Sequence, residues 1–152
     1  MKRSVCIIAI ILMATATGFS QADRVLGYWL TEEGDSQVRI FRATNGKYYG
    51  QIEWLKEPFE NGKPKVDDDN PDPALQNRPI LGLRLLNGFE YDGDDTEWQN
   101  GTIYDPKTGN TYDCYMWFGE NNGDVLCIKG YIMGIRFLGR ETKWTREGKL
   151  RD

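Results

Sequence analysis

Residues 27–29 read Gly27-Tyr28-Trp29, and residues 139–146 read Gly139-Arg140-Glu141-Thr142-Lys143-Trp144-Thr145-Arg146. Between these stretches apolar and polar side chains alternate with period two, the pattern of half-buried β-strands, and no long helical stripe occurs. A glycine-tryptophan start and an arginine- and tryptophan-bearing end, joined by strands and turns, predict a small closed β-barrel. Such a barrel either fills itself or holds one small ligand.

Eight segments fit the strand pattern, and short links rich in Gly, Asn and Asp join most of them, as between antiparallel neighbours. The segments are 25–31, 37–42, 47–55, 80–86, 98–104, 111–118, 124–131 and 137–145. The sequence therefore predicts an all-β fold with a single up-and-down antiparallel barrel of about eight strands, because closure removes the exposed edges of a flat sheet.

Residues 56–79 form the one connection that is too long for an ordinary hairpin. Within it, Asp72 suits a helix cap, Pro73 suits the first helical position, and Pro79 ends the pattern. We predict a short helix over 72–78 in this insert and expect the insert to cover one mouth of the barrel.

The first 22 residues have the features of a secretory signal peptide. Lys2 and Arg3 precede an apolar run, and Ser20 and Ala22 take the −3 and −1 positions of a cleavage site before Asp23. The run is too short for a transmembrane helix, which needs roughly 20 apolar residues. We predict a signal peptide over 1–22, one barrel domain over 23–152, and a soluble protein, periplasmic or secreted, after cleavage near Ala22/Asp23.

The composition excludes several function classes. The chain has no histidine, which removes imidazole acid–base catalysis, Ser-His-Asp triads and His-ligated metals. Neither a nucleophile elbow nor a nucleotide-binding glycine loop is present. Without the first 22 residues, 17 basic residues stand against 23 acidic ones, a formal charge of −6 that argues against nucleic acid and anionic membranes as partners. We predict no enzymatic activity, no cofactor and no metal.

Acidic residues gather in two loops, at 67–72 and at 92–95. Neither loop matches the spacing of an EF-hand, which leaves a looser oxygen-ligand site or, more simply, solvated loops with turn-forming Asp side chains.

Strand parity supplies the candidate ligand-binding residues. Glu141 and Lys143 mark the solvent face of the last strand, so Arg140 and Trp144 should point inward. An interior guanidinium needs a partner, which is either an anionic ligand group held bidentately or an internal carboxylate or tyrosine hydroxyl. The same alternation points several further side chains inward: Val38, Ile40, Tyr48, Gly50, Ile52, Trp54, Leu81, Leu83, Leu85, Leu126 and Ile128. Our ligand-binding candidates are Arg140, Tyr48, Trp54 and Trp144.

Cys114 and Cys127 flank a predicted hairpin. Their neighbours place them on opposite faces of the sheet, which argues against a disulfide, although a single β-bulge would restore the parity.

Ordered motifs along the chain resemble one bacterial family, domain of unknown function 2147, whose members are small exported proteins with a lipocalin-like barrel. The motifs are Gly27-Tyr28-Trp29-Leu30-Thr31, Tyr49-Gly50-Gln51-Ile52-Glu53-Trp54-Leu55, Asn70-Pro71-Asp72 with Arg78-Pro79, Ile103-Tyr104-Asp105-Pro106 with Gly109 and Tyr112, Lys129-Gly130-Tyr131, and 137–146. The resemblance covers essentially all of 23–152. It implies fold and export, and it carries over no catalytic residues.

The broader resemblance to lipocalins rests on Gly27, Trp29 and a basic residue of the last strand. It implies that the tryptophan closes one barrel end and that an arginine, Arg146 or Arg140, packs across it. If Arg140 does so, the ligand hypothesis weakens.

Two functions are open. The first is an exported, non-enzymatic protein that binds a small apolar or amphipathic, lipid-like ligand inside the barrel. The alternative is a protein-interaction or envelope-stress module with a filled barrel, which acts through Tyr115, Trp117 and the 56–79 insert.

Overall fold

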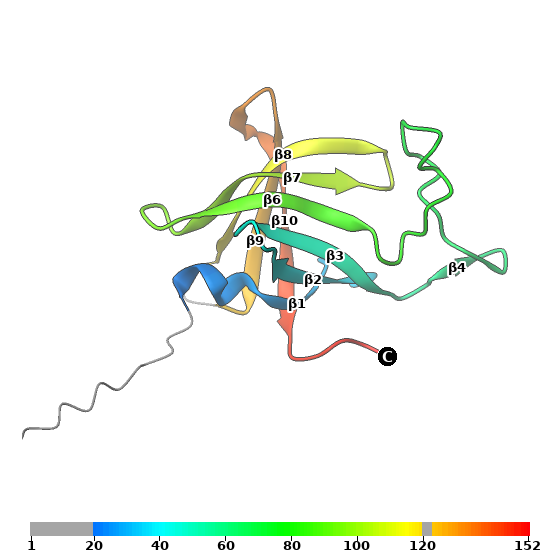
Figure 1. Cartoon of the computed structure of the whole chain (residues 1–152), viewed down its shortest axis with the longest axis horizontal. Helices are drawn as coiled ribbons and strands as arrows, with labels where there is room; N and C mark the ends of the chain where they lie inside the picture. The colour runs from blue at the N-terminus through cyan, green and yellow to red at the C-terminus, as the bar shows by residue number, and fades with distance from the viewer. Residues whose placement is uncertain (1–19, 120–122) are drawn as a thin grey trace, which may run out of the picture.

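The computed structural model describes residues 20–119 and 123–152 and shows a closed antiparallel barrel (Figure 1). The barrel strands are β1 (Gly27–Leu30), β2 (Ser36–Arg42), β3 (Tyr48–Leu55), β6 (Arg84–Asp92), β7 (Glu97–Asp105), β8 (Asn110–Phe118), β9 (Val125–Ile132) and β10 (Ile135–Glu147). Their order is β1-β10-β9-β8-β7-β6-β3-β2, and β1 pairs with both β2 and β10. The predicted eight-stranded up-and-down barrel is confirmed.

Three short elements lie outside the barrel wall. A 3-10 helix, η1 (Gln21–Val25), precedes β1, while β4 (Phe59–Glu60) and β5 (Lys63–Pro64) form a small separate hairpin. In this part of the chain no helix is long and apolar enough to cross a membrane. Residues 1–19, most of the predicted signal peptide, lie outside the described residues, and the predicted cleavage bond falls within η1.

The predicted helix over 72–78 is wrong. Asp72 does cap this segment, because its Oδ1 accepts the Ala74 N–H at 2.9 Å, but the chain then forms a run of turns. The Leu75 N–H donates to the Asp72 carbonyl and the Arg78 N–H to the Leu75 carbonyl. So short a segment between two prolines cannot repay the cost of nucleating a helix.

The predicted strand at 80–86 begins too early. Gly82 has a φ of +89°, and the Leu83 N–H donates to the Ile80 carbonyl, so this stretch turns before β6 starts. Leu81 is consequently exposed instead of inward, while Leu83 and Leu85 are buried as predicted.

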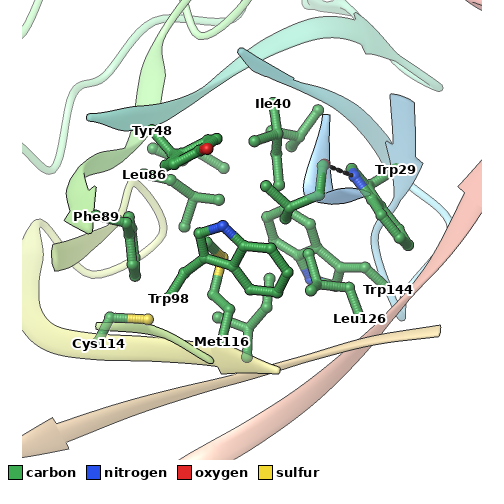
Figure 2. Close-up of a cluster of buried hydrophobic side chains, with 14 of the residues drawn as sticks. Trp29, Ile40, Tyr48, Leu86, Phe89, Trp98, Cys114, Met116, Leu126 and Trp144 are labelled. Atoms are coloured by element: carbon green, nitrogen blue, oxygen red, sulfur yellow. Dashed lines mark hydrogen bonds between the residues drawn. The ribbon is translucent and has the colours of Figure 1, made fainter. Parts of the chain in front are cut away.

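A packed core fills one end of the barrel (Figure 2). Aromatic rings supply much of it, with Trp98 at the centre: its ring centroid lies 6.5 Å from that of Tyr48 and 5.3 Å from that of Phe118. The remaining inward residues predicted from parity on β2, β3 and β9 are buried here, namely Val38, Ile40, Ile52, Leu126 and Ile128.

Two strand glycines make this packing possible. A Cβ on Gly101 would lie 2.5 Å from the ring of Phe89, and one on Gly50 would lie 2.8 Å from Leu86. A neighbouring core side chain therefore occupies the space at each glycine, and both glycines lie at register shifts of the strand pairing, as in β-bulges.

Cys114 and Cys127 are free thiols, and both are buried. Cys114 pairs with Gly130, and Cys127 pairs with Trp117, so the two cysteines stand at different levels of the β8–β9 ladder. The parity argument against a disulfide agrees with this arrangement.

Candidate ligand cavity

One end of the barrel is sealed by Trp29 and Arg146. The guanidinium carbon of Arg146 lies 4.2 Å from the Trp29 ring centroid. Its N–H groups donate to the carbonyls of Leu26 (3.0 Å), Gly123 (3.2 Å) and Arg24. On the other side, the Trp29 indole N–H donates to the Val25 carbonyl at 2.8 Å, which ties η1 to this end of the barrel. Figure 2 marks this bond at Trp29 with a dashed line.

Gly27 belongs to the same closure. Its φ of +118° lies in the region that favours glycine, and a Cβ there would lie 3.5 Å from Arg146 Nη1. The three residues predicted to close the barrel, Gly27, Trp29 and Arg146, therefore meet at one end.

The opposite end is hollow. A cavity of about 2100 Å³, open to solvent, extends from the barrel interior to the space under the 56–80 insert. Its floor is apolar and is formed by Ile52, Leu85, Ile128 and Trp144, all of which are buried. The packed core thus fills one end of the barrel, and the cavity opens at the other.

Arg140 lies on the wall of this cavity, together with Thr142 and Trp144 of the same strand. Alternation along β10 predicts this placement. Among the barrel-strand residues that line the cavity, Arg140 is the only one with a positive charge. Its side chain is exposed and makes no ion pair, hydrogen bond or ring contact with any other residue in 20–119 and 123–152. The alternative to an anionic ligand is an internal carboxylate or tyrosine hydroxyl that pairs with Arg140. No such partner is found in these ranges.

The mouth of the cavity carries charges of both signs. The loop at 32–35 and the insert both supply carboxylates. The insert also supplies three lysines, Lys56, Lys63 and Lys65. Lys107 contacts both Glu33 and Asp35, at 3.2 Å in the second case, and these contacts hold the pKa of Lys107 above its ordinary value. Because the rim carries charges of both signs, the rim by itself favours neither an anionic nor a cationic ligand.

Two of the predicted ligand-binding residues do not reach the cavity. Tyr48 points inward as predicted, but it belongs to the core of the sealed end, where its hydroxyl donates to Asp23 Oδ1 at 2.8 Å. Burial, followed by this contact with the carboxylate, raises the pKa of Tyr48 to about 12. Trp144 does line the cavity, at its floor.

The inward placement of Trp54 is wrong. Gln37 pairs with Trp54 while Val38 pairs with Ile52, so Glu53 is an extra residue in β3 and the bulge reverses the parity beyond it. Trp54 lies on the outer face, where its indole N–H donates to the Asp152 carbonyl at 2.9 Å and Arg151 packs over its ring. It holds the C-terminal segment instead of a ligand.

The insert is anchored beside the cavity through Asp67, which is fully buried. Its carboxylate accepts hydrogen bonds from the Tyr104 hydroxyl (2.6 Å), Asn70 Nδ2 (2.8 Å) and Arg78 Nε (2.9 Å). Burial and the Asp67 carboxylate raise the pKa of Tyr104. Nearby, a Cβ on Gly109 would lie 2.0 Å from the Asp69 carbonyl, so the insert also packs tightly on the β7–β8 turn.

Sequence reasoning missed this role of Asp67 and placed it in a solvated acidic loop. One signal was available in the sequence, because the partners Asn70, Arg78 and Tyr104 all belong to the family motifs. Their hydrogen bonds with Asp67 join the insert to the barrel. In residues 20–119 and 123–152 no group of three or more carboxylate or thiol side chains is arranged to hold a metal ion.

The outer face of β8 carries the other predicted contact residues. Tyr115 and Trp117 stack with a centroid separation of 5.2 Å, and the guanidinium of Arg136 lies 4.0 Å from the Tyr115 ring centroid. Arg136 also pairs with Glu97 across the strands. These residues border a separate depression of about 450 Å³ and not the cavity under the insert.

A family model described as "Uncharacterized protein conserved in bacteria (DUF2147)" matches residues 27–146. The chain belongs to this family. Among solved structures, "Protein HP1028 from the human pathogen Helicobacter pylori belongs to the lipocalin family" is similar, with a TM-score of 0.69 and 24% sequence identity over 82% of this chain and 83% of that chain. No curated protein matches the sequence. This family member thus has a lipocalin-like fold, an architecture that accommodates ligand binding.

Proposed function

We propose that this DUF2147 protein is an exported, non-enzymatic binding protein that holds one small amphipathic ligand in its barrel. The apolar part of the ligand lies on the floor formed by Ile52, Leu85, Ile128 and Trp144, and an anionic group pairs with Arg140. The observation that carries the proposal is the Arg140 guanidinium, which borders the cavity without a partner among the described residues.

The apolar floor supports a ligand with a hydrocarbon portion. Its aliphatic and aromatic side chains offer no charged group, so a polar molecule would lose its hydration there without compensation. Arg140 offers a planar fork of N–H donors that matches a carboxylate or phosphate. Together these features favour a fatty-acid-like or phospholipid-like molecule over a sugar or a peptide.

Native mass spectrometry and thermal shift test this function. Protein purified gently from an exporting host should carry a co-purified mass of lipid size, and long-chain carboxylates should raise its melting temperature. Alkyl ammonium ions of the same chain length are the matched probes, because they share the hydrocarbon but not the charge. If neither a co-purified mass nor a shift with any amphiphile appears, the binding function is excluded.

Arg140→Met tests the anchor specifically. Losing a charge-assisted hydrogen bond should weaken binding of the long-chain carboxylate by about tenfold or more. Lys143→Met is the matched control, because Lys143 lies on the outer side of the same strand, where it pairs with Glu141 at 3.9 Å. Equal affinity of the two variants would exclude Arg140 as the anchor.

Export is part of the same proposal and is supported by the signal-peptide features of residues 1–22. The expected product starts at Asp23, and N-terminal sequencing of protein from the producing bacterium checks it. The Trp98 indole N–H donates to the Ala22 carbonyl at 3.0 Å in the uncleaved chain, so cleavage there changes the partner of Trp98. Protein that retains residue 1 would contradict the proposed processing.

Protein interaction is the second candidate function. The stacked, half-buried Tyr115 and Trp117 on the outer face of β8 favour it, because aromatic side chains are enriched at interfaces. Trp117→Ser should abolish capture of a partner without lowering the melting temperature. Equal capture by the variant and the unmodified protein would count against this function.

A further inference from the structure

The tip of the β9–β10 hairpin leaves several large apolar side chains uncovered. Met133 is 84% exposed and Phe137 is 78% exposed, and the neighbouring Ile132 and Leu138 are exposed as well. In Figure 1 this hairpin, drawn in orange, projects beyond β8. A soluble protein gains nothing in folding from apolar groups that it leaves in water, so a contact outside the fold explains them better.

The turn at this tip uses methionine where the backbone favours another residue. Met133 and Gly134 connect the paired residues Ile132 and Ile135, and their φ values are +56° and +70°. A two-residue hairpin loop with two positive φ values strongly prefers Asn-Gly. The β4–β5 hairpin of the same chain follows that rule, with Asn61-Gly62 at +50° and +75°. A methionine at the equivalent position is therefore not explained by the requirements of the turn.

A large bulge displays the other apolar residues. Ile135 pairs with Ile132, whereas the next paired residue on β10 is Gly139, opposite Tyr131, so residues 136–138 have no ladder partners. Gly139 permits this route, because a Cβ there would lie 2.0 Å from the Gly130 carbonyl oxygen. The bulge turns Phe137 and Leu138 toward the mouth of the cavity, which both residues line.

The charge near the tip differs from that of the whole chain. Residues 129–140 contain Lys129, Arg136 and Arg140 and no acidic residue, although the chain has a formal charge of −4. In the fold Arg136 pairs with Glu97, and Arg140 lies on the cavity wall. An apolar tip flanked by basic side chains matches the boundary between the acyl chains and the phosphate groups of a phospholipid bilayer.

We infer that the β9–β10 tip is a membrane-docking edge. Met133, Phe137 and Leu138 insert into the bilayer surface, and the cavity mouth is held against the lipid. This inference goes beyond the ligand-binding function, which requires no membrane contact. The net negative charge repels an anionic surface at long range, so insertion of the tip drives binding, and raising the salt concentration does not weaken it.

Vesicle flotation tests this edge, with the purified protein and vesicles of phosphatidylethanolamine and phosphatidylglycerol. We expect a bound fraction that falls at least fivefold in Met133→Asn and in Phe137→Ser. Asn suits the turn, so Met133→Asn should fold as well as the unmodified protein, and an equal or higher melting temperature confirms it. Phe59→Ser is the matched control, because Phe59 is 62% exposed on a different hairpin.

Several outcomes overturn the inference. They are an absence of vesicle binding by the unmodified protein, equal binding by Met133→Asn and Phe137→Ser, and an equal loss in Phe59→Ser. A fourth is a dimer in sedimentation that Met133→Asn abolishes, since the tip would then join two copies of the chain. Flotation uses no soluble ligand, so its failure is distinguishable from a failure of Arg140→Met to weaken carboxylate binding.

Discussion

Arg146 packs over Trp29 with its guanidinium carbon 4.2 Å from the ring centroid, whereas the side chain of Arg140, on the same strand and the same face, has no partner among the described residues. The two arginines thus divide the roles that the sequence left open. Arg146 seals one end of the barrel, and Arg140 lies on the cavity wall at the other.

The first prediction contrasts these two arginines in stability. Arg146→Met removes the ring contact and leaves the carbonyls of Leu26, Gly123 and Arg24 without a donor, so we expect a loss of about 2–4 kcal/mol in the free energy of unfolding. Arg140→Met should change it by less than about 0.5 kcal/mol, as for an exposed residue without partners. Urea unfolding measures both. An equal loss in the two variants would contradict the division of roles.

The second prediction concerns the anchor of the insert. Tyr104→Phe removes a buried donor from Asp67, and we expect a loss of about 1–3 kcal/mol in the free energy of unfolding. The insert should also become more accessible, so trypsin should cleave within 56–80 faster than in the unmodified protein. Tyr112→Phe, on the neighbouring strand of the same cavity wall, is the control that should leave both measurements unchanged. Unchanged cleavage in Tyr104→Phe would mean that Asp67 does not hold the insert through Tyr104.

Much of the barrel could be predicted from the sequence because period-two alternation is a local signal. On β10 the solvent-facing Glu141 and Lys143 fix the parity of the whole strand, and parity alone places Arg140 and Trp144 on the cavity wall. The strand boundaries follow from Gly, Asn and Asp turns for the same reason, since a turn is specified by the residues within it.

The rest depended on features with no local signal. A single extra residue, Glu53, reverses the parity of β3 and moves Trp54 to the outer face. The alternation of apolar and polar residues contains no signal that predicts this bulge. Asp67 is buried by contacts with residues 3, 11 and 37 positions away, which only the folded chain brings together. The volume of the cavity likewise depends on how core side chains share space, not on their pattern.

The third prediction is a loss of stability at alkaline pH caused by Tyr48. Its pKa is raised to about 12 in the folded protein, above the ordinary value of 10.0, so the unfolded chain releases this proton first. The contribution is fully present below pH 10 and is lost as the pH rises toward 12, by up to about 2–3 kcal/mol.

Tyr48→Phe isolates this contribution. At pH 8 the variant should be less stable by about 1 kcal/mol, because the hydrogen bond to Asp23 is missing. Between pH 10 and 12 the unmodified protein should lose stability more steeply, so the difference should shrink or reverse. Parallel unfolding curves across this range would show that Tyr48 does not carry the alkaline transition.

The fourth prediction is that both cysteines remain reduced and unreactive in the folded protein. Burial raises the pKa of the Cys114 thiol and that of Cys127, so little thiolate is available for oxidation or alkylation, even in an oxidising compartment. The intact mass of the protein without residues 1–22, which lacks Cys6, should correspond to two free thiols. Iodoacetamide should modify neither cysteine in native buffer and both in denaturant, which serves as the positive control. A mass lower by two hydrogens, or rapid native alkylation of Cys114, would contradict the buried positions of these side chains in β8 and β9.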